Sequence, residues 1–145
     1  MDKYPILQAM SKEEAFRLLD IQGEFRKTQM KERYWNEETG LWWWEQHPDV
    51  KLRIVAACNR WKDVYFIAAR HSSIIMTQQQ LMYGGLKVLH EYAGDDHEQG
   101  FIDQYENFHS REEAVIIAKN NNQLYRAELE NRLVTINLFK LVLFC

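Results

Sequence analysis

Two apolar runs separated by a short polar turn constrain the fold of this 145-residue chain more than any other feature. The first run, LRIVAACN, covers residues 52–59, and the second, VYFIAA, covers residues 64–69. Both are rich in β-branched and aromatic side chains, and a polar RWKD joins them, which is the pattern of a β-hairpin. Because both runs are more apolar than a sheet with one wet face requires, we expect both strands to lie centrally in a sheet that is covered on both sides.

A long helix is predicted before this hairpin, over residues 11–34. Ser11 and Glu14 have the spacing of a capping box, which marks a helix start. We expect one apolar stripe of this helix to pack against the rest of the protein, namely Leu18, Ile21, Phe25, Met30 and Tyr34. Gly23 costs about 1 kcal/mol relative to Ala inside a helix and is the point where this helix is weakest.

The segment RYWNEETGLWWWEQHP, residues 33–48, is unusually aromatic. Trp42 and Trp44 alternate with Trp43 beyond a polar turn at Gly40, which predicts a short hairpin. The favoured interpretation is an aromatic cluster that joins the helix to the core. The alternatives are a ligand platform and a protein-interaction module built on the Trp side chains.

The second half of the chain alternates short strands and helices. Ser72 or Ser73 is a natural N-cap for a helix, in which Ile74, Ile75, Met76, Leu81 and Met82 supply apolar contacts before a stop at Gly84 and Gly85. A strand, a tight turn at 105–107, a second strand and a helix then follow. Ser110 and Glu113 form a second capping box, and Asn120–Asn122 end that helix.

The sequence therefore predicts an α+β fold in which helices pack against a small antiparallel sheet, with an N-terminal helical extension. Residues 1–50 would hold the helix and the Trp-rich segment, and residues 51–145 an α+β ligand-binding core, within one compact domain.

Composition narrows the range of functions that this chain could have. A net charge of −3 argues against general binding to a nucleic-acid backbone, which needs clustered cations, but leaves room for a small anionic ligand. Cys58 and Cys145 are too few for a disulfide framework, and the apolar stretch 133–145 is short and interrupted by Lys140, so we expect a cytoplasmic protein without a membrane span. The high aromatic content, 13%, favours a homo-oligomer.

One candidate ligand site lies at Arg70 and His71, directly before the predicted helix start at Ser72 or Ser73. The first turn of a helix presents unpaired N–H donors and a partial positive charge, and an arginine fork adds donors that suit phosphate oxygens. An anion is therefore expected there. The alternative is that Arg70 pairs with a carboxylate and His71 bonds to the backbone.

A second candidate site combines Phe101, Tyr105 and Phe108 with Arg111 at the first position of the later helix. Aromatic faces and a guanidinium can hold a base between them, while the helix start takes a phosphate. The alternative is that Phe101 and Phe108 belong to the core and Arg111 is a solvated surface charge.

Other chemistry has weaker support. The acidic segment around His97, with His90 and His109, offers metal ligands but no recognised metal spacing, and no nucleophile elbow or phosphate-binding glycine loop is present. We expect no cofactor and no metal. A phosphodiesterase or nuclease that uses His71, His97 and the acidic loop is the enzymatic alternative.

Residues 54–126 resemble a family of small phage proteins, the first-described phage anti-Thoeris sponges, in the ARH that follows the hairpin and in the stretch EQGFIDQYENFHSREEAVIIAKNNNQ. The resemblance implies a protein that is not an enzyme. It would act in the host cytoplasm and sequester a cyclic ADP-ribose isomer made by TIR proteins, in pockets between subunits; some members also hold cyclic oligonucleotides. The ligand-binding positions implied by the resemblance are Arg70, His71, Phe101, Phe108, Arg111 and Arg126.

Two parts of the chain depart from this family pattern. The first fifty residues, with their Trp cluster, are longer than the resemblance accounts for, and the ending TINLFKLVLFC lacks an acidic strand end. Either difference could remodel a pocket that lies between subunits.

Overall fold

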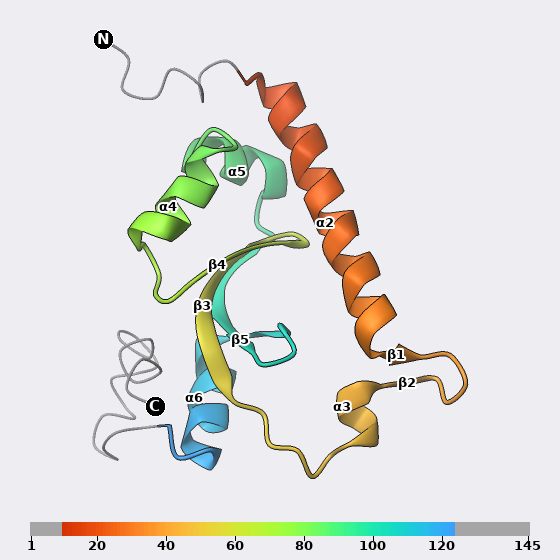
Figure 1. Ribbon diagram of the computed structural model, residues 1–145. Helices are drawn as coiled ribbons and strands as arrows, with labels where there is room; N and C mark the ends of the chain where they lie inside the picture. The colour runs from red at the N-terminus through yellow and green to blue at the C-terminus, as the bar shows by residue number, and fades with distance from the viewer. Residues whose placement is uncertain (1–9, 124–145) are drawn as a thin grey trace.

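The computed structural model describes residues 10–123 and has an α+β fold (Figure 1). The helices of this part are α2 (Lys12–Tyr34), α3 (Trp43–Gln46), α4 (Ile74–Leu81), α5 (Leu86–Ala93) and α6 (Arg111–Asn120). The strands are β1 (Trp35–Asn36), β2 (Leu41–Trp42), β3 (Ile54–Trp61), β4 (Val64–Ala68), β5 (His97–Asp103) and β6 (Phe108–His109). The predicted fold class is confirmed: helices pack against small antiparallel sheets, and a long N-terminal helix precedes them.

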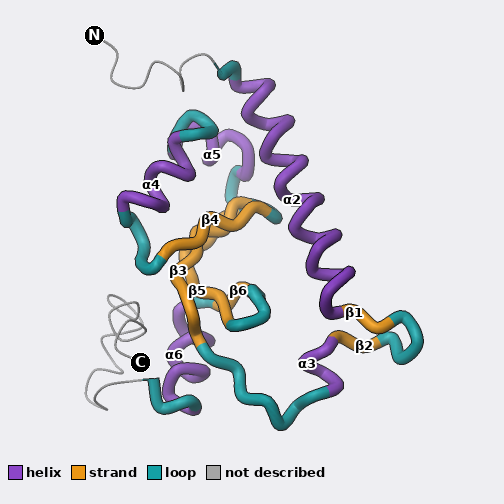
Figure 2. The backbone as a smooth tube through the Cα atoms, viewed as in Figure 1, coloured by secondary structure: helices purple, strands orange, loops and turns teal. Residues whose placement is uncertain are grey.

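The main sheet has the strand order β4-β3-β5-β6, and every neighbouring pair is antiparallel (Figure 2). The predicted hairpin is present as β3 and β4. β3 is central, since it pairs with β4 on one side and with β5 on the other. In residues 10–123, β4 pairs only with β3, so the expectation that both strands lie centrally is right for β3 and wrong for β4.

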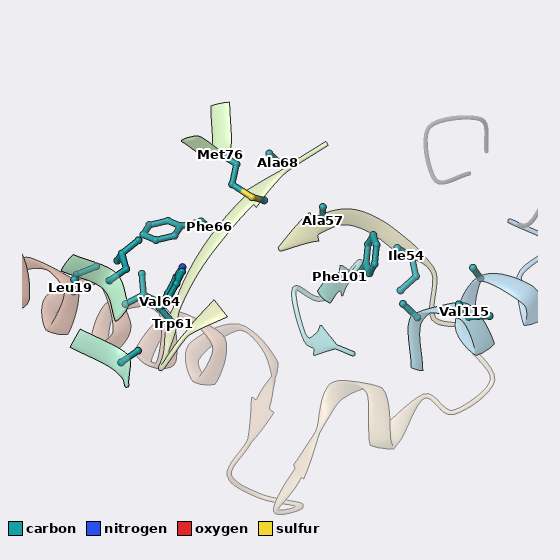
Figure 3. Close-up of a cluster of buried hydrophobic side chains, with 14 residues drawn as sticks. Leu19, Ile54, Ala57, Trp61, Val64, Phe66, Ala68, Met76, Phe101 and Val115 are labelled. Carbon is teal, nitrogen blue, oxygen red and sulfur yellow. The ribbon is translucent and has the colours of Figure 1, made fainter. Parts of the chain in front are cut away.

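The core lies between the sheet and the helices α4, α5 and α6, with Leu19 of α2 at one end (Figure 3). Its largest fully buried apolar side chains are Phe101, Leu19, Ile54, Met76 and Leu89. Burial of each such side chain contributes about 1.5–3 kcal/mol. Cys58 is also completely buried, as a core cysteine would be, and burial raises the pKa of its thiol to about 12.

The buried face of α2 is not the predicted stripe. Ile21 and Phe25 are 49% and 62% exposed. The buried residues of α2 are Ala15, Leu19, Gly23 and Met30, so the prediction is right for Met30, the one member of the predicted stripe that is buried.

Gly23 explains why a different face of α2 is buried. A Cβ there would lie 3.1 Å from Cβ of Asp63, in the turn between β3 and β4, so the missing side chain lets the helix approach the hairpin closely. The helix runs unbroken through Gly23. At its start the Ser11 hydroxyl accepts from the Glu14 amide, but the Glu14 carboxylate pairs with Arg17.

The Trp-rich segment forms the predicted short hairpin, β1 and β2, followed by the one-turn helix α3. Tyr105, from the turn between β5 and β6, contacts the rings of Tyr34, Trp43 and Trp44 at centroid distances of 5.3–5.8 Å. The aromatic cluster therefore joins the end of α2 to the main sheet, as the favoured interpretation predicted. The strand alternation stops at Trp42, because Trp43 and Trp44 are helical.

The helix α4 begins after Ser73, as predicted, but it buries little of its apolar surface. Among the five residues expected to supply contacts, Met76 alone is fully buried, while Ile74, Ile75 and Met82 are 79%, 60% and 56% exposed. The reason is geometric: α4 turns a narrow face with Met76 and Gln80 toward the sheet. Within the described part of the chain, no helix has the length and apolarity that crossing a membrane requires.

The helix α6 matches its prediction closely. Ser110 and Glu113 form both halves of the capping box, and the helix ends at Asn120. Ala114 and Ala118 are completely buried, and Ile117 packs against the same cluster. Ala114, Ile117 and Ala118 therefore lie on the inward face of the helix.

Candidate functional site

One residue from each candidate ligand site reaches strand β5: His71 bonds to Gly100, and Arg111 bonds to Gln99. His71 reaches this strand from the loop after β4, and its Nε2 lies 2.8 Å from the Gly100 carbonyl oxygen and 3.4 Å from that of Cys58. The edge of its ring contacts Phe101, with 5.1 Å between centroids. His71 thus fastens the loop to the centre of the sheet.

The charge of His71 depends on its surroundings in the fold. Burial lowers the pKa of His71, and the positive charge of Arg111 lowers it further. At neutral pH the ring is uncharged, so Nε2 donates to the carbonyl oxygens and Nδ1 keeps a lone pair. The alternative interpretation, in which His71 bonds to the backbone, is confirmed for this residue.

Arg111 is the first residue of α6 and lies on the same side of β5 as His71. Its Nη2 donates to Oε1 of Gln99 over 2.8 Å, which ties the start of α6 to the strand. Its positive charge also contributes to the lowered pKa of His71. The structure therefore brings together His71 and Arg111, which are forty residues apart in the sequence.

Arg70 is exposed, and no hydrogen bond or ion pair of its side chain occurs among residues 10–123. The carboxylate partner considered for it is therefore absent from that range. Three residues later the Ser73 hydroxyl accepts from the Met76 amide over 3.1 Å and caps α4. A guanidinium and a helix start thus lie close together in the sequence on the surface of the protein.

Phe101 and Phe108 lie on opposite faces of the sheet. Phe108 pairs directly with Ile102, the neighbour of Phe101, and side chains alternate along a strand. Phe101 is 2% exposed and belongs to the core, as the alternative interpretation predicted. Phe108 is half-buried and contacts the ring of Tyr65 on the other face. Within one chain the two rings do not stack on opposite sides of a single base.

Gly100 was missed in the sequence, although the site depends on it. A Cβ at this position would overlap the carbonyl oxygen of His109 and the ring of Phe108. Glycine is therefore required where β6 crosses close to β5. A glycine inside an apolar strand pattern was the available signal.

Asp103 was also missed. It is completely buried, and its Oδ1 accepts from the amides of Tyr105 and Asn107 at 2.8 and 3.1 Å, while Oδ2 lies 2.7 Å from Nε2 of His109. These bonds organise the turn between β5 and β6 and so set the position of Ser110. An aspartate that opens a tight turn was the signal in the sequence.

The histidines considered as metal ligands separate into two groups. His90 and His97 both pack against Trp61, whereas His109 binds Asp103. In residues 10–123 no three His, Cys, Asp or Glu side chains are grouped so that they could hold a metal ion. Arg126, the remaining candidate ligand-binding residue, and Cys145 lie outside the described residues.

A model of the phage T4 y16D protein family matches residues 53–142. The matched range begins just before β3 and includes β4, β5, β6 and α6, together with all six candidate ligand-binding residues. Comparisons with curated proteins and with solved structures gave no match. Since the family model covers well over half of the sequence, the chain belongs to the phage T4 y16D protein family.

Proposed function

We propose that this phage-family protein binds a small nucleotide immune signal and holds it without cleaving it. The observation that carries the proposal is the convergence of His71 and Arg111 on Gln99 and Gly100, with the exposed guanidinium of Arg70 next to His71 in the chain. The signal would be a cyclic ADP-ribose isomer made by TIR proteins, and cyclic oligonucleotides are further candidates.

We call the surface formed by Arg70, His71, Arg111 and the start of α4 the anion site. Its charges suit the phosphates of such a ligand. Arg70 and Arg111 supply planar donor groups, and the first turn of α4, which carries no acidic residue, adds partial positive charge. His71 contributes position rather than charge, since its Nε2 proton is bonded to a strand carbonyl. That role supports binding rather than acid catalysis by this nitrogen.

Sequestration demands tight binding, and one chain offers an open surface at this place. A dissociation constant near 1 nM corresponds to about −12 kcal/mol, which a small ligand reaches when it is nearly enclosed. Ile74 and Ile75, which follow His71 after two serines, are 79% and 60% exposed. A second copy of the chain that packs on these residues would cover the apolar surface and close the site.

The test is recovery of an intact ligand. The protein is incubated with a cyclic ADP-ribose isomer, separated from free ligand and denatured by heat, and the released ligand is analysed by mass spectrometry. We expect the unmodified protein to release the unchanged ligand. The amount recovered should be smaller for Arg70→Gln and Arg111→Gln and unchanged for the surface control Arg33→Gln. Cleavage products would instead favour the phosphodiesterase, and no bound ligand would contradict the proposal.

A further inference from the structure

The two ring nitrogens of His71 have different surroundings. Nε2 lies 2.8 Å from the Gly100 carbonyl oxygen and 3.4 Å from that of Cys58, so it faces the sheet. Among residues 10–123, Nδ1 has no hydrogen-bond partner, and it is not one of the buried side-chain atoms that lack a partner. The side chain is half-buried, and Nδ1 is therefore the nitrogen that reaches solvent.

The contacts of Nε2 determine the chemical character of Nδ1. A carbonyl oxygen can only accept a hydrogen bond, so Nε2 carries a proton. Burial and the positive charge of Arg111 lower the pKa of His71, and the ring is neutral near pH 7.5. A neutral imidazole has a single N–H, so Nδ1 presents a lone pair and accepts hydrogen bonds.

The ring is held in this orientation. A half-turn of the ring would place a carbon atom opposite the Gly100 carbonyl oxygen and break the 2.8 Å hydrogen bond. The ring also meets Phe101 edge-on, with 5.1 Å between centroids, and Phe101 is fixed in the core. The acceptor at Nδ1 is therefore a built feature of the anion site.

An acceptor beside two arginines discriminates between the parts of a ligand. The guanidinium groups of Arg70 and Arg111 attract phosphate oxygens. An ionised phosphate oxygen carries only lone pairs, so it gains no hydrogen bond from Nδ1 of His71 and is repelled by its lone pair. A hydroxyl group can donate to Nδ1. The ligand that satisfies both kinds of group carries a hydroxyl donor a few bonds away from its phosphates, as the ribose of a nucleotide does.

We propose that Nδ1 of His71 accepts a hydrogen bond from a ribose hydroxyl of the bound nucleotide and so selects ribonucleotides over nucleotides that lack these hydroxyls. His71 has this role only if the phosphates lie at Arg70 and Arg111, so the inference rests on the proposed function. The guanidinium groups then supply affinity for the phosphates, and His71 supplies selectivity for the sugar.

Two nucleotides test the selectivity. ADP and dideoxy-ADP have the same base and the same diphosphate, and they differ only in the two ribose hydroxyls. We expect the unmodified protein to bind ADP about tenfold more tightly, which is the change expected when an acceptor loses its partner. Isothermal titration calorimetry at pH 7.5 measures both dissociation constants.

A variant pair assigns the selectivity to Nδ1. In His71→Gln the amide can still donate to Gly100, but the side chain has a carbon atom at the δ position, where histidine has Nδ1. ADP should then bind as weakly as dideoxy-ADP. His47→Gln changes an exposed histidine that stacks on Trp43, and it should keep the tenfold preference. A preference that persisted in His71→Gln would overturn the proposal.

Nitrogen NMR of the unliganded protein tests the state of the ring without any ligand. We expect His71 to have a protonated Nε2 and an unprotonated Nδ1 at pH 7.5. A protonated Nδ1 would overturn the proposal even if His71→Gln failed to fold.

The same titrations distinguish failure of this proposal from failure of the proposed function. Arg70→Gln should weaken the binding of both nucleotides by the same factor and leave their ratio unchanged. Equal binding of ADP and dideoxy-ADP to the unmodified protein would refute the role of His71 alone. No binding of either nucleotide at millimolar concentration would refute the anion site, and the role of His71 with it.

Discussion

The starts of α4 and α6 follow the same local rule and yet differ in charge. In each, a serine hydroxyl accepts from the amide three residues later, Ser73 from Met76 and Ser110 from Glu113. The first turn of α6 also carries Glu112 and Glu113, whereas that of α4 carries no acidic residue. The partial positive charge of α6 is therefore offset by its own carboxylates, and that of α4 is not.

Glu113 makes this difference concrete. Its carboxylate accepts from the Ser110 amide over 2.8 Å, and this hydrogen bond lowers the pKa of Glu113. An anion at the start of α6 would have to compete with that carboxylate. The comparison teaches that a helix start can have the sequence of a phosphate site and yet already bind a carboxylate of the same chain.

The two arginines also differ in how firmly the protein holds them. Arg111 is held by Gln99, while the Arg70 side chain extends from an exposed loop. We infer that α6 serves mainly as a scaffold for Arg111, and that Arg70 and the start of α4 form the more open half of the anion site.

The largest expected effect on stability comes from Gly100→Ala, because Gly100 lies between the α4 half of the anion site, through His71, and the α6 half, through the close approach of β6. The added methyl group would push against the His109 backbone and the Phe108 ring and displace the carbonyl that anchors His71. We expect the free energy of unfolding to fall by about 3 kcal/mol, at the upper end for overpacking. Urea denaturation followed by circular dichroism measures it.

Gly23→Ala is the matched control for this substitution. Its Cβ would press against Asp63 Cβ at 3.1 Å and meet Val64 at an ordinary 3.8 Å. The helix propensity gained, about 1 kcal/mol, offsets the close contact with Asp63, so the stability should change by less than about 1 kcal/mol. If Gly100→Ala were as stable as Gly23→Ala, the α4 and α6 halves of the anion site would not be coupled through β5.

The second prediction ranks the two arginines. Arg70→Gln should weaken pyrophosphate binding about tenfold and change the free energy of unfolding by less than about 0.5 kcal/mol, as for a surface residue. Arg111→Gln should weaken binding less and also destabilise the protein, since it loses the bond to Gln99. Titration calorimetry and urea denaturation give both values. The opposite ranking would reverse the assignment of scaffold and open half.

The two capping serines provide a third, smaller effect. Ser73→Ala should cost about 1 kcal/mol and Ser110→Ala up to about 2 kcal/mol, because the second substitution breaks a complete capping box that positions a buried helix. Thermal unfolding by calorimetry compares the two variants. Ser110→Ala keeps the backbone amide that bonds to Glu113, so equal losses would mean that the Ser110 hydroxyl gains nothing from its place in a complete capping box.

The smallest effect concerns pH. Because the pKa of His71 is lower in the folded protein, the unfolded chain binds more protons as the pH falls below about 6.5. The stability linked to His71 is therefore present above that pH and is lost as the pH falls through the folded-state pKa. Urea denaturation from pH 7.5 to 5 should show a shallower loss in His71→Gln than in the unmodified protein. Identical slopes would contradict a buried neutral His71.

Local features of this chain could be predicted from the residue pattern. The hairpin of β3 and β4, the serine caps of three helices and the end of α6 depend on bonds between residues a few positions apart. Their signals are contained in short windows of the sequence. The candidate residues Arg70, His71 and Arg111 were found in the same way, as residues beside a helix start.

Features that depend on distant contacts could not be predicted. Gly23 of α2 meets Asp63, and that approach decided which face of the helix is buried. The register between β5 and β6 placed Phe101 and Phe108 on opposite faces, and burial beside Arg111 made His71 neutral. Residue type and spacing established the elements and the kind of ligand chemistry to look for. The packing of segments far apart in the chain decided which side chains share a surface and which of them are charged. Burial and electrostatic fields arise only once those segments meet.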